Sequence, residues 1–204
     1  MLKTVLVVAA SYLLGCFCTA YYLVRWRMGQ DIRTLGSGNA GAKNAGRILG
    51  PAGFVAVFLG DVAKGSLAVG LALWQGLAPW GVVLAYLAVV LGHLYPVQLG
   101  FRGGKGVAAG FGGLLVLDPV LAAGVVVAAG LAFLLTRSFT LSGLVAIGLA
   151  PFIGLVLNST ASQVVAVALI SALLLYAHRT NMAEMIRQRA ARAEDATHQD
   201  RARG

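Results

Sequence analysis

The sequence predicts an all-α integral membrane protein with about seven transmembrane helices, its N-terminus outside and its C-terminus in the cytoplasm. Hydrophobic residues make up 59% of the 204 residues, and charged residues only 11%. A soluble globular domain carries about 25% charged residues, so lipid is the natural solvent for the apolar surplus. Several apolar runs are long enough to cross a bilayer, and the basic residues gather between them on one side.

The first apolar run, residues 5–24, spans the hydrocarbon core at about 1.5 Å per residue. Its start resembles a signal peptide, and Leu13-Leu14-Gly15-Cys16 resembles a lipoprotein cleavage box. The run continues past that box and stops at Arg25 and Arg27, as a stop-transfer sequence does. We therefore predict one uncleaved helix, in which Cys16 and Cys18 are small buried apolar residues rather than a disulfide.

The next two runs, residues 48–74 and 80–99, carry polar residues inside the membrane. Asp61 and Lys64 are three positions apart, so a helix brings them to one face. Ionisable residues are costly in lipid and are usually paired or functional, and we predict a structural ion pair here. His93 is predicted to be a structural hydrogen-bond donor.

The second half of the chain contains four apolar runs. The first of them, residues 107–117, is too short to span as a full helix and ends at Asp118-Pro119, because proline disfavours helix in the residue before it. The other three cover residues 120–135, 141–157 and 164–177. We predict a single membrane domain over residues 1–189 and a basic, disordered tail over residues 190–204, which has few large apolar side chains.

Positive charge is distributed unevenly around these runs. Segments 25–47, 100–106 and 136–140, together with the C-terminal tail, fall on one side and hold 14 of the 16 Lys and Arg residues. By the positive-inside rule that side is cytoplasmic. The net charge of +9 therefore points to anionic lipids and anionic substrates, not to nucleic acid, because most basic residues flank apolar runs.

Three hydrophilic segments on this side are too specific for simple connections. Residues 36–47 combine Gly36, Gly38 and Gly41 with polar donors. The glycines allow close backbone approach, and successive N–H groups can form an anion nest. This GxGxxG match is not a dinucleotide motif, because a membrane helix precedes it where that motif needs a βαβ unit. The alternative is a flexible polar loop.

The other two segments are shorter. Residues 100–106 fail the P-loop pattern at positions 99 and 106, yet they offer glycines, the cation Lys105 and a helix that starts near Gly106. In the third segment, His178 and Asn181 share one helical face, and a histidine there can act as a base or donate to a phosphate. The alternatives are a short basic loop and an ordinary interfacial histidine. CxxC, HExxH and GxSxG motifs are absent from the sequence, so neither a metal site nor a serine nucleophile is predicted.

Together these segments resemble the three motifs of the bacterial acyl-phosphate:glycerol-3-phosphate acyltransferases, the PlsY family. The resemblance covers about residues 10–182. It is carried by Gly36-Ser37-Gly38-Asn39 through Asn44 and Arg47, by His93-Leu94-Tyr95-Pro96 leading to Phe101-Arg102-Gly103-Gly104-Lys105-Gly106-Val107, by His178-Arg179-Thr180-Asn181, and by Asp61-Val62-Ala63-Lys64-Gly65.

The resemblance implies transfer of a fatty acyl group from acyl-phosphate to the 1-hydroxyl of sn-glycerol 3-phosphate, giving lysophosphatidic acid and phosphate in phospholipid biosynthesis. The implied location is the cytoplasmic face of a bacterial inner membrane. The implied partners are the two substrates and membrane lipids, with no metal, cofactor or coenzyme A. The hydroxyl proton goes either to His178 or to a phosphate oxygen of the donor.

Site residues are implied position by position. The catalytic residues, which also resemble the family's glycerol-phosphate contacts, are Ser37, Arg47, Lys105, His178 and Asn181. The substrate-binding residues are Gly38, Asn39, Asn44, Arg102, Gly103, Gly104 and Gly106. Among these, Gly103, Gly104 and Gly106 are expected to offer backbone N–H groups to acyl-phosphate, and Asn39 and Asn44 to orient the first loop.

The sequence also departs from the family pattern. Lys43 and Ala109 stand where the family has threonine, Glu184 stands where it has arginine, and Gln188-Arg189-Ala190 replaces Gly-x-Glu. These changes leave open a non-catalytic or substrate-shifted relative. A transporter for a small phosphorylated anion is a further alternative, although we see no internal repeat and the candidate site lies on one face rather than at the midplane. We favour an active enzyme because the core donors are intact.

Overall fold

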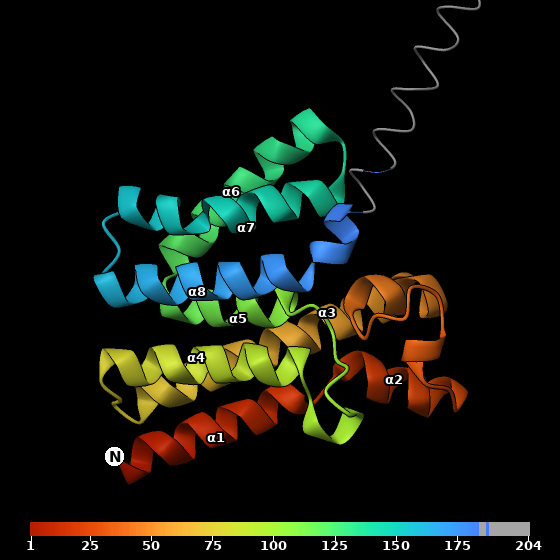
Figure 1. Cartoon of the computed structure of the whole chain (residues 1–204), viewed down its shortest axis with the longest axis horizontal. Helices are drawn as coiled ribbons and strands as arrows, with labels where there is room; N and C mark the ends of the chain where they lie inside the picture. Colours follow the sequence, from red (N-terminus) through yellow and green to blue (C-terminus); the bar gives the residue numbers. More distant parts are fainter. Residues whose placement is uncertain (184–186, 188–204) are drawn as a thin grey trace, which may run out of the picture.

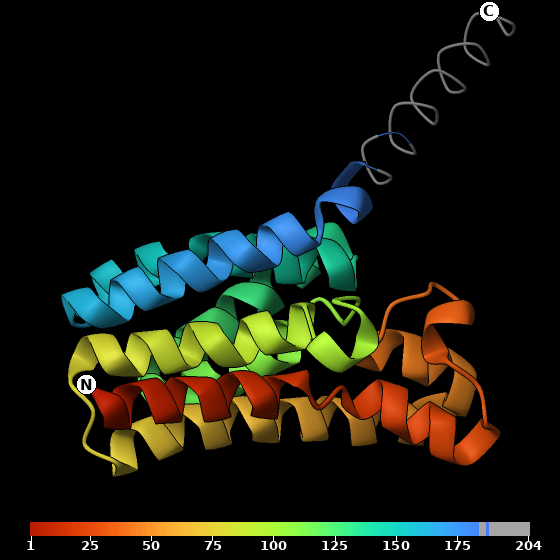
Figure 2. The same ribbon diagram turned by 60° about the horizontal axis from the view of Figure 1, so that its bottom comes forward.

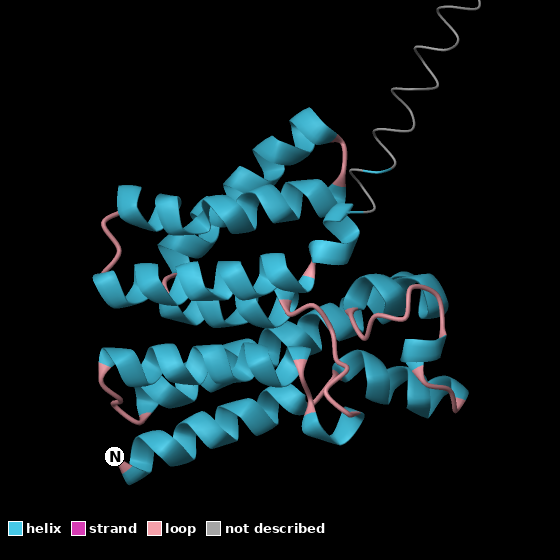
Figure 3. Cartoon of the chain, viewed as in Figure 1, coloured by secondary structure: helices cyan, strands magenta, loops and turns pink. Residues whose placement is uncertain are grey.

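The computed structural model describes residues 1–183 and residue 187, and every regular element in this part of the chain is helical (Figure 3), which confirms the all-α prediction. The helices run back and forth between the two ends of a bundle, with the N-terminus at one end and the last described turn at the other (Figures 1 and 2). The elements are α1 (Leu2–Cys16), α2 (Thr19–Met28), η1 (Ile32–Thr34), α3 (Ala42–Trp74), α4 (Pro79–Leu94), η2 (Val97–Leu99), α5 (Val107–Leu117), α6 (Pro119–Thr136), α7 (Phe139–Val156) and α8 (Ala161–Ala177).

Five segments of the described chain are long and apolar enough to cross a membrane, and α5 and α8, with 11 and 17 residues, are shorter. The count of about seven spans and the direction of crossing therefore stay predictions. The predicted tail over residues 190–204 lies outside the described residues, as do Glu184 and Gln188-Arg189-Ala190. The five long segments are Leu2–Met28, Ala42–Trp74, Pro79–Leu99, Pro119–Thr136 and Phe139–Val156.

The first apolar run is two helices, not the single helix that the sequence predicts. α1 ends at Cys16, and the chain is extended at Phe17 and Cys18 before α2 begins. The break exposes the carbonyls of Gly15 and Phe17, which accept hydrogen bonds from Lys64 Nζ at 3.1 Å and 2.8 Å. Irregular backbone is tolerated at membrane depth where the protein itself satisfies its polar groups, and here a lysine of α3 does so.

Glycines allow the closest helix contacts. A Cβ added to Gly15 in α1 would collide with the carbonyl of Val89 in α4, and one added to Gly112 in α5 would collide with the carbonyl of Val62 in α3. Close backbone approach at small residues is a principal source of helix association in lipid. These glycines let the helices pack closely, with α4 against both α1 and α3.

The polar segments gather at one end of the bundle, opposite the N-terminus (Figure 1). α3 kinks there at Gly50, whose φ of 76° and following Pro51 interrupt the helix. Its first turns pack with α2 and η1 over a small core that includes Ala20, Val24 and Ile32. This arrangement brings the loop after α2, the loop before α5, the start of α7 and the end of α8 close together.

Candidate active site

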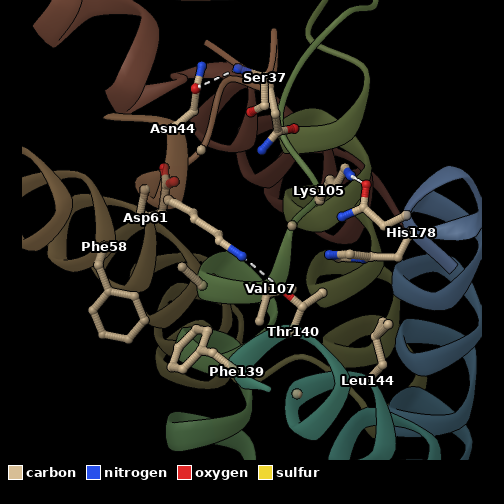
Figure 4. A pocket seen from close by; sticks show the side chains of 18 of the residues that line it. Ser37, Asn44, Phe58, Asp61, Lys105, Val107, Phe139, Thr140, Leu144 and His178 are labelled. Atoms are coloured by element: carbon tan, nitrogen blue, oxygen red, sulfur yellow. Dashed lines mark hydrogen bonds between the residues drawn. The ribbon is translucent and has the colours of Figure 1, made fainter. Parts of the chain in front are cut away.

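A pocket of about 890 Å³ opens among these polar segments (Figure 4). One side carries cations, amides and hydroxyl groups, and the other side is formed by apolar side chains of α3 and α7. The polar lining residues are Ser37, Asn39, Lys43, Asn44, Arg47, Asp61, His93, Lys105, Thr140, His178, Thr180 and Asn181, and the large apolar ones are Phe54, Phe58, Val107, Phe139, Leu144 and Ile147.

Asn44 fixes the first loop beside this pocket. Its buried side chain accepts a hydrogen bond from the Ser37 N–H at 2.9 Å and donates to the carbonyls of Leu35 at 2.9 Å and Ile32 at 3.3 Å. Gly36 and Gly38, with φ of 54° and 70°, turn the chain on either side of Ser37. Ser37 is therefore held at the pocket through its backbone, and the amide of Asn44 is engaged within the loop itself.

Arg33 ties the first loop to the segment that leads into the second. Its guanidinium donates to the carbonyl of Leu99 at 2.6 Å and pairs with Asp31 at 2.7 Å. The hydrogen bonds from Arg33 hold the pKa of the Asp31 carboxyl below its ordinary value. The hydrogen bonds of Arg33 thus join the two loops.

The second loop is anchored to the end of α4. The N–H groups of Gly103 and Gly104 donate to the carbonyls of Leu94 and His93, each at 3.1 Å. A Cβ on either glycine would collide with His93. Neither glycine lines the pocket, and the exposed Arg102 does not line it either. This geometry corrects the expectation that Gly103 and Gly104 offer their N–H groups to substrate, and it removes the geometric ground for a substrate contact by Arg102.

Gly106 does line the pocket. Its φ of 81° lets the chain turn into α5, which begins at Val107. Val107 and Ala108 in the first helical turn also line the pocket. The N-terminal end of α5, whose first N–H groups have no partner within the helix and carry partial positive charge, therefore borders the pocket.

His178 caps the end of α8, and its ring points into the pocket (Figure 4). Its Nδ1 lies 2.8 Å from the carbonyl of Leu174, which can only accept, so Nδ1 carries the proton and Nε2 of the neutral ring is an acceptor. Burial lowers the pKa of His178; the bond to the Leu174 carbonyl opposes this shift, and the Lys105 charge adds to it. Lys105 Nζ donates to Asn181 Oδ1, which joins the second and third segments.

A buried polar cluster lies on the α3 and α4 side of the pocket. Lys64 Nζ is 3.0 Å from Asp61 Oδ1 and 2.7 Å from His93 Nδ1, and Thr19 donates to Asp61 Oδ1 at 3.0 Å. The predicted ion pair is thus present. His93 Nδ1 accepts from the lysine, because an ammonium group has no lone pair, so the predicted donor is an acceptor at this nitrogen. Asp61 and His93 also line the pocket.

Most of the predicted site residues meet in this one pocket. Sequence reasoning missed its apolar wall, although Phe54 and Phe58 are four positions apart on α3 and their rings stack with centroids 6.0 Å apart. Such spacing places two side chains on one helical face and was an available signal. Phe139 and Thr140 come from α7, and nothing local marks them. The predicted residues that line the pocket are Ser37, Gly38, Asn39, Asn44, Arg47, Lys105, Gly106, His178 and Asn181.

The fold and the pocket define a helical membrane protein whose site combines several cations with an apolar wall. A family model described as glycerol-3-phosphate acyltransferase matches residues 5–188, and the chain belongs to this family. The family resemblance found in the sequence motifs is thereby confirmed.

Individual relatives agree with this assignment. Glycerol-3-phosphate acyltransferase 1 of Desulfitobacterium hafniense is 45% identical over 180 residues, which cover 88% of this chain and 89% of the relative. Glycerol-3-phosphate acyltransferase of Parasynechococcus marenigrum is 43% identical over 190 residues, covering 91% and 88% of the two chains.

Two solved structures share the fold. Both are of PlsY (YgiH), an integral membrane glycerol 3-phosphate acyltransferase. Its glycerol 3-phosphate form has a TM-score of 0.85 and 32% identity, with 92% of this chain and 94% of that chain covered. Its lysophosphatidic acid form has a TM-score of 0.83 and 31% identity, with coverage of 92% and 93%.

Proposed function

We propose that this protein transfers a fatty acyl group from acyl-phosphate to the 1-hydroxyl of sn-glycerol 3-phosphate, forming lysophosphatidic acid and releasing phosphate. The observation that carries the proposal is the pocket, which joins a cationic, amide-bearing side to an aromatic side. A water-soluble phosphate ester and an activated lipid need these two environments next to each other. Family membership and the two substrate- and product-named PlsY structures support the same reaction.

The polar side provides what the two phosphates require. Arg47 and Lys105 supply charge-assisted hydrogen bonds, which are stronger than neutral ones. The first turn of α5 adds backbone N–H groups and partial positive charge. We assign the Ser37 hydroxyl and the Asn181 amide, both at the pocket, to orienting the glycerol backbone. Holding both reactants in one pocket makes the reaction effectively unimolecular.

The chemistry follows from an acceptor and an activated donor. The 1-hydroxyl oxygen attacks the acyl carbonyl carbon, a tetrahedral oxyanion forms, and the carbon–oxygen bond to phosphate breaks. The hydroxyl proton goes to Nε2 of His178 or to an oxygen of the leaving phosphate, and the neutral, Nδ1-protonated ring supports His178. Since acyl-phosphate is already activated, no covalent enzyme intermediate is needed, and the cations and helix dipole stabilise the developing charge.

The proposed location is the cytoplasmic face of a bacterial inner membrane. The gathering of the basic loops at the end of the bundle that holds the pocket supports this orientation (Figure 1). A pocket at one end also favours an enzyme over a transporter, whose binding site is expected near the midplane.

Turnover tests the proposal directly. Purified protein in lipid, given palmitoyl-phosphate, is expected to release phosphate only when glycerol 3-phosphate is present, with lysophosphatidic acid identified by mass. Consumption of palmitoyl-phosphate without the acceptor would indicate hydrolysis or a different acceptor. Folded protein that consumes nothing would favour the non-catalytic relative.

The protonation state of His178 gives the reaction a predictable pH dependence. A lowered pKa keeps the ring neutral at pH 7, so its acceptor role is present there and is lost as the pH falls through the lowered pKa. We expect kcat/KM for glycerol 3-phosphate to be level near neutrality and to decline only below about pH 6.5, the ordinary value for imidazole. Rates measured from pH 5 to 8 check this.

The matched control is His178→Asn, assayed over the same range. The decline in acid should be absent from its residual activity. A decline that persists unchanged in His178→Asn would belong to the phosphates of the substrates and would contradict the role of the ring.

A further inference from the structure

Lys43, in the first turn of α3, reaches to the wall formed by α7. Its Nζ donates a hydrogen bond to Thr140 Oγ1 at 2.9 Å, drawn as the dashed line to Thr140 in Figure 4. Both residues line the pocket, and Lys43 is exposed. In the same view Thr140 lies between Phe139 and His178. The ammonium group of Lys43 therefore sits at the boundary between the polar and the apolar side.

The charge of Lys43 is needed to balance the negative charge of the two substrates in the pocket. Among the described lining residues, Lys43, Arg47 and Lys105 are the lysines and arginines, and Asp61 is the carboxylate. Asp61 is already paired with Lys64 at 3.0 Å. A singly substituted phosphate group carries about −1.5 to −2 charges near pH 7, so the phosphate groups of the two substrates bring about three to four negative charges. Arg47 and Lys105 balance only about half of them.

Thr140 is a partner that Lys43 can exchange for a phosphate. In the bond to Thr140 only the donor is charged, whereas a phosphate oxygen accepts the same hydrogen bond and adds the attraction between opposite charges. The flexible four-carbon stem of a lysine lets its Nζ move by rotamer changes. Because Lys43 is exposed, the exchange needs no rearrangement of the core.

The surroundings of Lys43 select one of the two phosphates. Phe54 and Phe58 follow Lys43 along α3, and Phe139 directly precedes Thr140. An acyl chain resting on these rings brings the phosphate at its head to Lys43. The corner formed by Lys105 and Asn181 beside His178 is then left to the water-soluble acceptor.

We propose that Lys43 is the contact for the phosphate of the acyl donor and that Thr140 holds it in place until the donor binds. The inference rests on the proposed function and names the residue that sets the affinity of the protein for the acyl donor. Lys43 thereby controls donor binding and leaves acceptor binding to the opposite corner of the pocket.

Direct binding to the purified full chain in lipid nanodiscs tests this. The donor probe is hexadecyl phosphate, which cannot transfer an acyl group, and the acceptor probe is glycerol 3-phosphate. Lys43→Met keeps most of the apolar stem and removes the charge. We expect it to raise the Kd for hexadecyl phosphate about tenfold and to leave the Kd for glycerol 3-phosphate within about twofold. The KM for palmitoyl-phosphate should rise in parallel.

Thr140→Val is the matched control. It removes the hydroxyl that accepts from Lys43, keeps the charge of Lys43, and nearly keeps the shape of the side chain at position 140. We expect it to lower the Kd for hexadecyl phosphate by about twofold, since Lys43 no longer has to leave a hydrogen bond. If Thr140→Val raises the Kd for hexadecyl phosphate as much as Lys43→Met does, the hydrogen bond between the two residues only joins α3 to α7, and the inference is overturned. A Lys43→Met effect on glycerol 3-phosphate instead, or on neither probe, would overturn it as well.

Binding separates this inference from the proposed function, because it needs no turnover. Wild-type protein that binds hexadecyl phosphate through Lys43 and forms no lysophosphatidic acid would refute the function and support the phosphate contact. Wild-type protein that does not bind hexadecyl phosphate would overturn the contact outright.

Discussion

Replacing Lys105 with alanine is expected to lower kcat/KM for acyl transfer by about 100-fold or more. Losses of this size are usual when an enzyme loses one preorganised hydrogen-bond donor to the charge that develops in the transition state. Lys105 lines the pocket and donates to Asn181, so it joins the loop before α5 to the end of α8. The substitution removes a phosphate-binding cation and the contact that positions Asn181. Because Lys105 lies in a polar loop, membrane insertion and folded yield should match the wild type.

Arg102→Ala is the matched control for this substitution. Arg102 belongs to the same loop and carries the same charge, but it is exposed and does not line the pocket. We expect its kcat/KM to stay within about twofold of wild type, the range usual for surface changes. Equal losses in both variants would point to general electrostatic attraction of the substrates. Normal turnover in Lys105→Ala would sink the assignment of the phosphate site.

Element ends that depend on neighbouring residues could be read from the sequence. α5 covers residues 107–117 as expected, because Gly106 supplies a left-handed turn before it and Asp118 caps the helix that starts at Pro119. The Asp118 side chain accepts from the N–H of Leu121 at 2.9 Å. Interactions over one to four residues are visible in any local pattern, which is why these bounds were predictable.

The break between α1 and α2 could not be read in this way. Phe17 and Cys18 are neither glycine nor proline, and their surroundings are as apolar as the rest of the run. The group that stabilises the break is Lys64, which lies 47 residues beyond Phe17 and satisfies its carbonyl. A conformation that depends on a distant donor leaves no local signal, so apolar periodicity predicts a continuous helix.

In the candidate site too, local features could be predicted from the sequence and long-range contacts could not. Residue types with distinctive chemistry, such as Lys105, His178 and Asn181, stood out because the membrane sequence around them is so apolar. Their partners did not. Gly104 packs closely against His93. Lys43 donates a hydrogen bond to Thr140, 97 residues away, and the two residues meet only because α3 and α7 face the same pocket. Chemical identity is local, whereas geometry is set by tertiary packing.

Replacing Asp61 with alanine is expected to lower the free energy of unfolding by about 3–5 kcal/mol, the range for a buried ion pair that loses one partner. The side chains of Asp61 and Lys64 are only 2% and 3% exposed. The variant leaves Lys64 with the carbonyls of Gly15 and Phe17 and with His93, but without a carboxylate. An uncompensated ammonium inside the membrane is costly, so folded yield after extraction and the thermal unfolding temperature should both fall.

Asp31→Ala is the matched control, since Asp31 also pairs with a cation, Arg33, at 2.7 Å. That pair is about one-quarter exposed, so its loss should cost at most about 1 kcal/mol. The double variant Asp61→Ala/Lys64→Met removes both buried charges and should regain part of the stability that Asp61→Ala loses. If Asp61→Ala is as stable as Asp31→Ala, the ion pair does not hold the bundle together. If it is also inactive, Asp61 becomes a residue of the active site, where it already lines the pocket.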